Sequence, residues 1–234
     1  SGKSDFVDQM VVGYNNNYGW KTAFASPENQ PTYLHAHKLL RKTWQGMPTK
    51  EDIGSERWNQ IADHCNSNYF HIDMERYTLD SVLRKGAELV KRKGIKCLVI
   101  DPFNKVRDVG GSDDVNRYTM EYLQKIEIFA KKYDVLVFIV AHPTKMYKNQ
   151  KTGEIDEPTM YSIKGGGEWY DASYHGILVH RNYNDNTVKA KVLKVKFQNL
   201  GTNQAEAHFK WESKSGCFIP HEQLNISGEK MPWE

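Results

Sequence analysis

The chain has 234 residues, of which 39% are hydrophobic, and its 32 basic and 29 acidic residues leave a net charge of +3. This length and apolar content suffice for one sizeable hydrophobic core. The net charge is too small to require a nucleic-acid partner, although local basic patches still permit one. The three cysteines show no CxxC spacing, which argues against a disulfide framework or a zinc site. No apolar run is long enough to span a bilayer and no leader segment opens the sequence, so we expect no membrane partner and a cytoplasmic setting.

The first four residues, Ser1-Gly2-Lys3-Ser4, match the end of the phosphate-binding motif GxxxxGK[ST]. In that motif backbone N–H groups and the lysine hold phosphates, and the serine holds Mg²⁺. Only the second half of the motif is present, so we expect the sequence to begin inside the loop, although a match this short also arises by chance. The apolar stripe that follows predicts a helix over residues 4–14.

Three predicted strands are each followed by a residue capable of acid–base or metal chemistry. Residues 21–26 precede Glu28, residues 95–100 precede Asp101, and residues 135–141 precede His142. The last two strands are nearly continuous apolar runs, as expected in a parallel sheet buried on both faces, whose carboxyl ends border the ligand crevice. There Glu28 can activate a water and Asp101 can organise a metal; alternatively, Glu28 starts a helix and Asp101 starts a loop.

Helical periodicity and capping residues predict the elements between these strands. Helices are expected over residues 30–44, after a capping box formed by Thr49 and Asp52, from Thr78 to the basic run 91–93, and over residues 115–132. Residues 69–72 read as a short strand. These elements alternate as in an α/β sheet covered by helices.

Basic residues occur in three predicted loops: Lys105 and Arg107, then Lys145 and Lys148, then Lys164. The last precedes three glycines, and Gly165 and Gly166 would let the backbone approach a ligand closely beside a lysine suited to a phosphodiester. A mobile surface turn is the alternative for this glycine segment.

In the C-terminal third, the sequence pattern changes from alternating helices and strands to consecutive strands. Residues 176–180 form a strand that ends at Arg181, and residues 187–219 alternate as antiparallel strands at the sheet edge. Lysines alternate along residues 187–197, where they suit an edge strand protected from aggregation. We therefore expect an α/β fold with a mostly parallel central sheet, flanking helices and C-terminal antiparallel strands. Residues 1–221 form one domain, and residues 222–234 form a polar tail.

In this order, the features resemble the RecA-like P-loop NTPase core of hexameric DnaB-type helicases, of the phage primase-helicase and Twinkle-like type. The resemblance covers essentially the whole chain. It implies that ATP or another NTP binds with Mg²⁺. The phosphates would contact Gly2, Lys3 and Ser4, and Mg²⁺ would contact Ser4 and Asp101, the Walker B carboxylate.

The same resemblance implies roles for the remaining candidates. Glu28 would be the catalytic base, His142 the γ-phosphate sensor, and Arg181 and Phe209 the pair that sandwiches the nucleotide base. Lys194 and Lys196 would reach the γ-phosphate of a neighbouring subunit; the family generally has Arg where this chain has Lys196, and lysine lacks the planar guanidinium fork. DNA contacts would come from the residues of the three basic loops, namely Lys105, Arg107, Lys145, Lys148, Lys164, Gly165 and Gly166.

The function implied is an ATP-dependent helicase motor that forms a ring, expected to be a hexamer, and moves 5′ to 3′ along single-stranded DNA during replication. A primase or a helicase loader is a further expected partner, in a bacterial or phage-infected cell. Two alternatives remain open: a RecA/RadA-type recombinase ATPase that forms filaments, and a non-catalytic DNA-binding or assembly module on the same scaffold.

Overall fold

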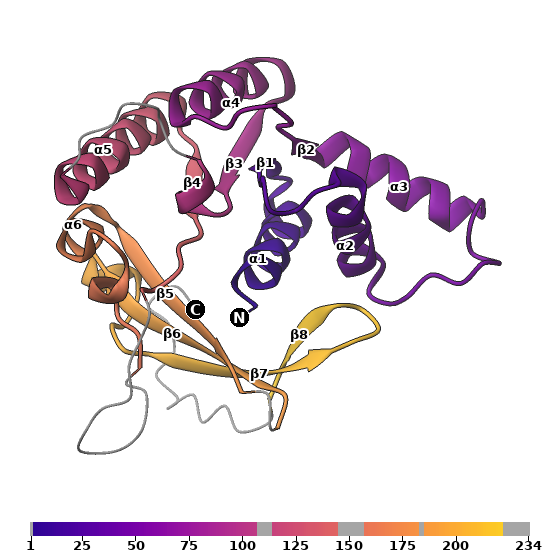
Figure 1. Ribbon diagram of the computed structural model, residues 1–234. Coiled ribbons are helices and arrows are strands. Elements are labelled where there is room, and N and C mark those ends of the chain that lie inside the picture. The colour runs from indigo at the N-terminus through magenta and orange to yellow at the C-terminus, as the bar shows by residue number, and fades with distance from the viewer. Residues whose placement is uncertain (1, 107–113, 145–156, 183–184, 222–234) are drawn as a thin grey trace.

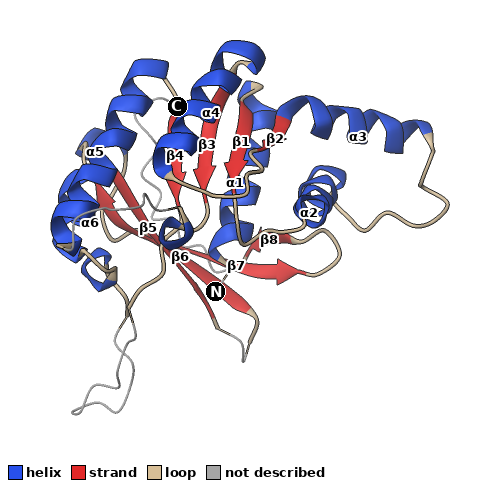
Figure 2. Ribbon diagram, turned by 45° about the horizontal axis from the view of Figure 1, so that its top comes forward, coloured by secondary structure: helices blue, strands red, loops and turns tan. Residues whose placement is uncertain are grey.

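The computed structural model describes residues 2–106, 114–144, 157–182 and 185–221, and its strands form two four-stranded sheets (Figures 1 and 2). The first sheet is parallel with the order β2-β1-β3-β4; the strands are β1 Lys21–Ala25, β2 Tyr69–His71, β3 Ile95–Ile100 and β4 Leu136–Ile139. Its two central strands are almost wholly buried because their apolar runs meet helices on both faces. The expected parallel sheet is confirmed.

Six helices belong to the described residues: α1 Lys3–Tyr18, α2 Thr32–Trp44, α3 Glu56–Asn68, α4 Leu79–Lys93, α5 Val115–Tyr133 and α6 Gly166–Ala172. Alternate residues of the parallel strands face opposite helix layers. Phe24 and Val99 pack with α1 and α2, whereas Ala23 and Leu98 pack with α4 and α5. No helix among these residues is both long and apolar enough to cross a membrane.

Side-chain caps define several helix starts, and one of them differs from expectation. Thr78 caps α4 as predicted, its hydroxyl accepting the backbone N–H of Ser81 at 3.2 Å. The prediction of a helix start at Thr49 and Asp52 was wrong. Asp52 does accept the Thr49 backbone N–H at 2.7 Å, but only in a turn, because α3 begins at Glu56 behind the cap Ser55.

The second sheet is antiparallel with the order β5-β6-β7-β8; its strands are β5 His175–Arg181, β6 Thr187–Val195, β7 Glu206–Glu212 and β8 Cys217–Pro220. The lysine-rich strand β6 lies inside this sheet, so its expected role as a protected edge strand was wrong. The Lys191 ammonium instead pairs with Glu157 at 2.9 Å and Glu206 at 3.2 Å.

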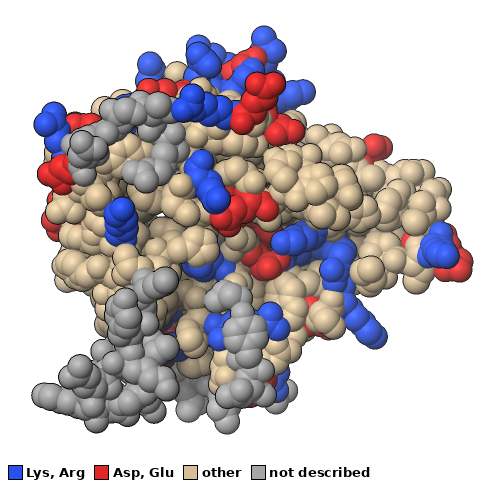
Figure 3. All heavy atoms as spheres, viewed as in Figure 1, with Lys and Arg blue, Asp and Glu red and all other residues tan. Residues whose placement is uncertain are grey.

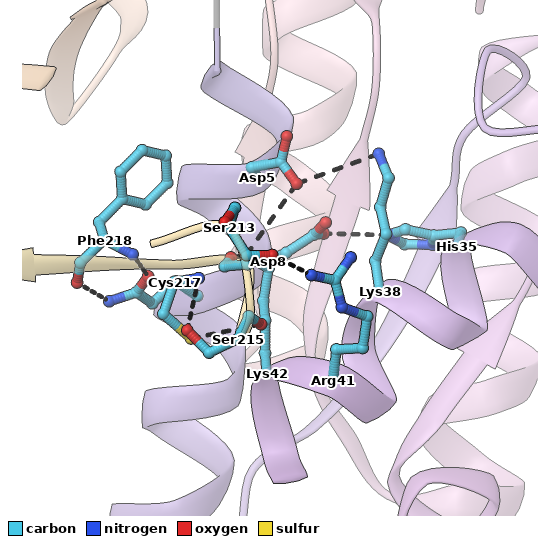
Figure 4. Close-up of polar contacts among 12 residues, drawn as sticks. Asp5, Asp8, His35, Lys38, Arg41, Lys42, Ser213, Ser215, Cys217 and Phe218 are labelled. Carbon is cyan, nitrogen blue, oxygen red and sulfur yellow. Dashed lines mark hydrogen bonds and ion pairs between the residues drawn. The ribbon is translucent and has the colours of Figure 1, made fainter. Parts of the chain in front are cut away.

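Strand β8 joins the antiparallel sheet to the helices of the parallel sheet. The Gln9 amide on α1 donates to the Phe218 carbonyl at 2.8 Å and accepts the Phe218 N–H at 2.5 Å, which satisfies backbone groups of this edge strand. Arg41 and Lys42 of α2 donate to backbone carbonyls of the β7–β8 turn (Figure 4). The α1 amino end therefore lies between the two sheets.

The three cysteines are all free. The expected polar tail, residues 222–234, lies outside the described residues, and the prediction of one domain over residues 1–221 stays a prediction. Figure 3 shows acidic and basic side chains mixed over α4 and α5 rather than one basic patch. Ion pairs such as Lys85–Glu88 at 3.1 Å and Lys125–Asp80 at 2.8 Å explain this mixture.

Candidate functional site

The carboxyl ends of β1, β3 and β4 meet at one edge of the parallel sheet. Ala25 pairs with Ile100, and Ile100 pairs with Ile139, so the three strands end in register. The chain then leads directly to Glu28, Asp101 and His142. Parallel topology thus places all three segments at the edge where open α/β sheets bind ligands.

Asp101 is the buried centre of this edge, with only 4% of its surface exposed. Its carboxylate hydrogen-bonds with the Ser4 side chain and accepts from the Asn29 amide at 3.4 Å. Burial raises the pKa of Asp101, and the negative charges of Asp8 and Glu28 raise it further, whereas the Ser4 hydrogen bond lowers it. A cation bound here would therefore stabilise a carboxylate that its surroundings disfavour.

The oxygen atoms of Ser4 and Asp101 fit a hard divalent cation such as Mg²⁺. Their contact places a hydroxyl and a carboxylate together at the start of α1. No group of three or more His, Cys, Asp or Glu side chains suited to a metal occurs within the described parts of the chain. Mg²⁺ would therefore depend on phosphate oxygens and water for its remaining ligands, as is usual for this ion.

Lys3 lies in the first turn of α1 and points toward the same edge. Its Nζ atom is 3.3 Å from Nδ1 of His142. Burial lowers the pKa of Lys3, while the carboxylates of Asp101 and Glu28 raise it. The unpaired N–H groups of a helix start favour anions, and Gly2 before them has a φ of 96°. Lys3 and His142 thus converge on a place that suits a terminal phosphate.

Glu28 lies in the turn after β1 and is exposed to solvent. Its carboxylate is close enough to act electrostatically on both Lys3 and Asp101. An exposed carboxylate beside a phosphate site can reach water, as a catalytic base must. Sequence reasoning named Glu28 but missed its neighbour Asn29, which contacts Asp101; the only signal was its position next to Glu28.

Arg181 and Phe209 occupy one row of the antiparallel sheet. Arg181 pairs with Val188, and Val188 pairs with Phe209, so the two side chains share a face with backbones about 10 Å apart. Phe209 lies 5.9 Å from the ring of Phe6, two residues after Ser4. Arg181 donates to Asn186 at 2.5 Å. The expected base-binding pair therefore lies beside the start of α1.

Lys194 and Lys196 contact residues of their own chain around α6. Lys194 donates to the carbonyl groups of Tyr170 and Asp171, and burial lowers its pKa. The Lys196 ammonium lies 4.0 Å from the ring centroid of Tyr174. Among the described contacts, neither lysine reaches Lys3, Asp101 or His142.

Lys105 and Lys164 are both exposed, and Lys164 lines a pocket of about 240 Å³. The pocket is also lined by His142 and by Asn104, the residue before Lys105, so it connects the sheet edge at His142 to Lys164, one of the expected DNA contacts. Gly165 and Gly166 are tightly packed: an added Cβ would lie 2.4 Å from the Thr119 hydroxyl and the Tyr161 carbonyl, respectively. Arg107, Lys145 and Lys148 lie outside the described residues.

Comparison with known proteins gives a sequence relative named as a Twinkle homologue. No family model matches the chain. The Twinkle homolog protein, chloroplastic/mitochondrial, of Arabidopsis thaliana is 31% identical over 203 residues, which make up 80% of this chain and 27% of that protein. The chain therefore spans about a quarter of the length of this curated relative.

Solved structures share the fold across almost the whole chain. An ATPase domain superposes with a TM-score of 0.73 and 14% identity, covering 94% of this chain and 81% of that one. A DnaB-like replicative helicase, studied with its interactions with primase, superposes with a TM-score of 0.70 and 15% sequence identity. The superposition covers 93% of this chain and 54% of that one. The RadB recombinase superposes with a TM-score of 0.60 and 12% sequence identity, covering 94% of this chain and 86% of that one. The fold is therefore RecA-like, as expected.

Proposed function

We infer that this chain, a RecA-like domain of the DnaB helicase type, is the motor domain of an ATP-dependent replicative DNA helicase. The observation that carries the proposal is the convergence of four side chains at one sheet edge. Ser4 contacts Asp101, and Lys3 contacts His142. This arrangement supplies the lysine, hydroxyl, carboxylate and sensor that nucleoside triphosphate hydrolysis requires.

Each of these residues has a separate part in the proposed hydrolysis. Lys3 and the first N–H groups of α1 would bind the terminal phosphates, and His142 would contact the γ-phosphate beside Lys3. Mg²⁺, held through Ser4 and Asp101, would neutralise phosphate charge when bound. Glu28 would orient a water and accept its proton, and Arg181 and Phe209 would hold the base by cation–π contact and stacking.

We propose that the active unit is a ring, expected to be a hexamer, with single-stranded DNA in its channel. Lys194 and Lys196 support this assembly, since they lie at the end of β6 and contact α6 and Tyr174 rather than Lys3, Asp101 or His142 of their own chain. In a ring they would reach the γ-phosphate held by the next subunit. DNA would be held by the basic loops through its phosphates, which makes binding sequence-independent and salt-sensitive.

A primase or a loader remains a proposed partner; the structure of a DnaB-like helicase was itself studied with primase. The sequence relative is named as chloroplastic/mitochondrial, so the expected bacterial or phage-infected cell receives no support. A recombinase is the less favoured alternative, because RadB superposes with a lower TM-score and the sequence relative is a Twinkle homologue. A non-catalytic module would retain DNA binding without hydrolysis.

The decisive experiment is ATP hydrolysis by the complete protein, with and without single-stranded DNA. Glu28→Gln should lower kcat by about 100-fold or more while nucleotide binding persists, because only the base is removed. Glu51→Gln, an exposed carboxylate in the α2–α3 connection, should leave the rate unchanged. Unchanged turnover in Glu28→Gln would refute the base assignment. Absence of hydrolysis in the wild type would select the non-catalytic alternative.

A further inference from the structure

Two tyrosines form an exposed stacked pair beside Lys164. Tyr161 lies in the short 3₁₀ turn Met160–Ser162, and Tyr170 lies in α6. Their ring centroids are 5.2 Å apart and their planes differ by 19°, so the rings are stacked. Tyr161 is 61% exposed and Tyr170 is 37% exposed. A stacked pair of this kind offers an aromatic face to solvent.

Buried neighbours hold the pair in place. Met160 and Trp169, each adjacent to one of the tyrosines, are 6% and 3% exposed. The Trp169 indole N–H donates to the Lys164 carbonyl at 3.1 Å. Gly166 permits the close approach of α6 to the 3₁₀ turn, since an added Cβ would lie 2.4 Å from the Tyr161 carbonyl. The two rings are therefore positioned before any ligand arrives, which reduces the entropy lost on binding.

Cationic groups flank the rings. Lys164 is exposed three residues after Tyr161. The Lys194 ammonium lies 4.7 Å from the ring centroid of Tyr170. Aromatic faces combined with lysines are the usual surface for single-stranded nucleic acid, because bases stack on the rings while ammonium groups meet the phosphates. A purely apolar protein partner would gain nothing from these charges.

The tyrosine pair is also connected to the edge of the parallel sheet at which Asp101 and His142 lie. Thr144 donates to the Ser162 carbonyl through its backbone N–H at 2.7 Å and through its hydroxyl at 3.0 Å. Pro143 forms an isolated β-bridge with Ile163. These contacts attach the segment that carries Tyr161 to the two residues directly after His142. The segment that carries Tyr161 and the segment that follows His142 are therefore held together by hydrogen bonds.

We propose that Tyr161, supported by Tyr170, is a stacking site for one base of single-stranded DNA, with Lys164 on the adjoining phosphate. This rests on the proposed function and deepens it: the strand would be held by a base as well as by its phosphates. Stacking tolerates all four bases, so the contact adds affinity without sequence preference.

The test compares oligothymidylate with an abasic oligomer of the same length, both fluorescently labelled, in binding to the complete protein by anisotropy. Tyr161→Leu should weaken oligothymidylate binding by about 5- to 100-fold and leave abasic binding unchanged, because only the former can stack. Tyr161→Phe should bind like the wild type. Tyr33→Leu is the matched control, since Tyr33 on α2 is 62% exposed and should affect neither oligomer.

Equal binding of oligothymidylate by the wild type and Tyr161→Leu would overturn the stacking site. If Lys164→Ala then weakened both oligomers, phosphate-directed DNA binding would stand, and with it the proposed function. A change in sedimentation of Tyr161→Leu without any base-dependent loss would show that the pair contacts a neighbouring subunit instead, which also overturns the proposal. Failure of the wild type to bind either oligomer would refute the helicase function itself.

Discussion

At the scale of single residues, a chain of buried and half-buried hydrogen bonds supports the helix that carries Lys3 and Ser4. Asp8 of α1 lies 2.9 Å from Nε2 of His35, and Nδ1 of His35 lies 2.9 Å from Nε2 of His71 (Figure 4 shows the first contact). Asp8 and His35 are both close enough to influence Asp101. The three side chains link α1, α2 and β2, and thereby help to position the helix that begins at Lys3 and Ser4.

His71 makes the stability of the fold depend on pH. Burial and, to a smaller extent, the nearby His35 lower the pKa of His71, and the carboxylates of Asp8 and Asp73 oppose the shift, so that the pKa falls to about 4. The unfolded chain binds this proton near pH 6.5, so stability is full above that value and falls as the pH drops toward 4. We expect a loss on the order of 1–2 kcal/mol, discounted because the ring is partly exposed.

Urea unfolding between pH 7.5 and 4.5 measures this loss, and His71→Gln should reduce its pH dependence. His37→Gln, an exposed histidine on α2, should retain the wild-type dependence. The same slope in His71→Gln as in the wild type would show that His71 is not the titrating group.

At the scale of elements, the β7–β8 hairpin is fixed to α2 by a buried lysine. The Lys42 side chain is 1% exposed, donates to the Gly216 carbonyl and lies 5.0 Å from the Trp211 ring centroid. Burial lowers the pKa of Lys42, and Asp5 at 4.0 Å raises it. Because Phe209 lies on β7, this attachment also positions one of the expected base contacts.

Replacement of Lys42 by alanine should lower the free energy of unfolding by about 2–4 kcal/mol, through a lost charged hydrogen bond and a cavity. Chemical denaturation measures the effect. Lys38→Ala on the same helix is the control: Lys38 is also 4.0 Å from Asp5 but is 42% exposed, so its loss should cost less than about 1 kcal/mol. Equal effects of the two substitutions would contradict a special role for the buried lysine.

At the scale of the whole molecule, the residues proposed to act in nucleotide hydrolysis are distributed over the two sheets. Lys3, Asp101 and His142 lie at the carboxyl edge of the parallel sheet, whereas Arg181, Phe209 and Lys194 lie in the antiparallel sheet. Lys196, which the proposed ring uses as a finger to the neighbouring γ-phosphate, directly follows β6. Lys196 is directed to Tyr174 of its own chain, so a complete catalytic centre would require a second subunit.

Mixing Lys196→Ala with Lys3→Ala subunits tests that requirement. Each variant alone should hydrolyse ATP very poorly, and a 1:1 mixture should recover up to about a quarter of the wild-type rate, the share of interfaces with one intact site and one intact finger. Lys3→Ala mixed with Asp101→Asn is the control and should not recover, since both variants damage the same side. No recovery in the first mixture would refute action between subunits.

The sequence by itself determined the strands and the residues at their ends. Apolar runs before Asp101 and His142 are local signals of buried parallel strands, and parallel order brings their ends together whatever the detailed packing. The glycine, lysine and serine at the start of α1 also form a local sequence motif. For these reasons the parallel sheet, the residues that follow its strands and the Thr78 cap of α4 were predicted.

Only the tertiary structure decided what contacts these elements make. That β6 is an interior strand, that α3 begins at Glu56, and that the antiparallel strands form a separate sheet all depend on pairing between distant segments. The Asp8–His35–His71 chain and the Tyr161–Tyr170 pair likewise join residues of different elements, whose contact no helical or strand periodicity in the sequence predicts. Side-chain periodicity reports which face of an element is buried, but partners far apart in the chain are chosen by packing, which no local pattern encodes.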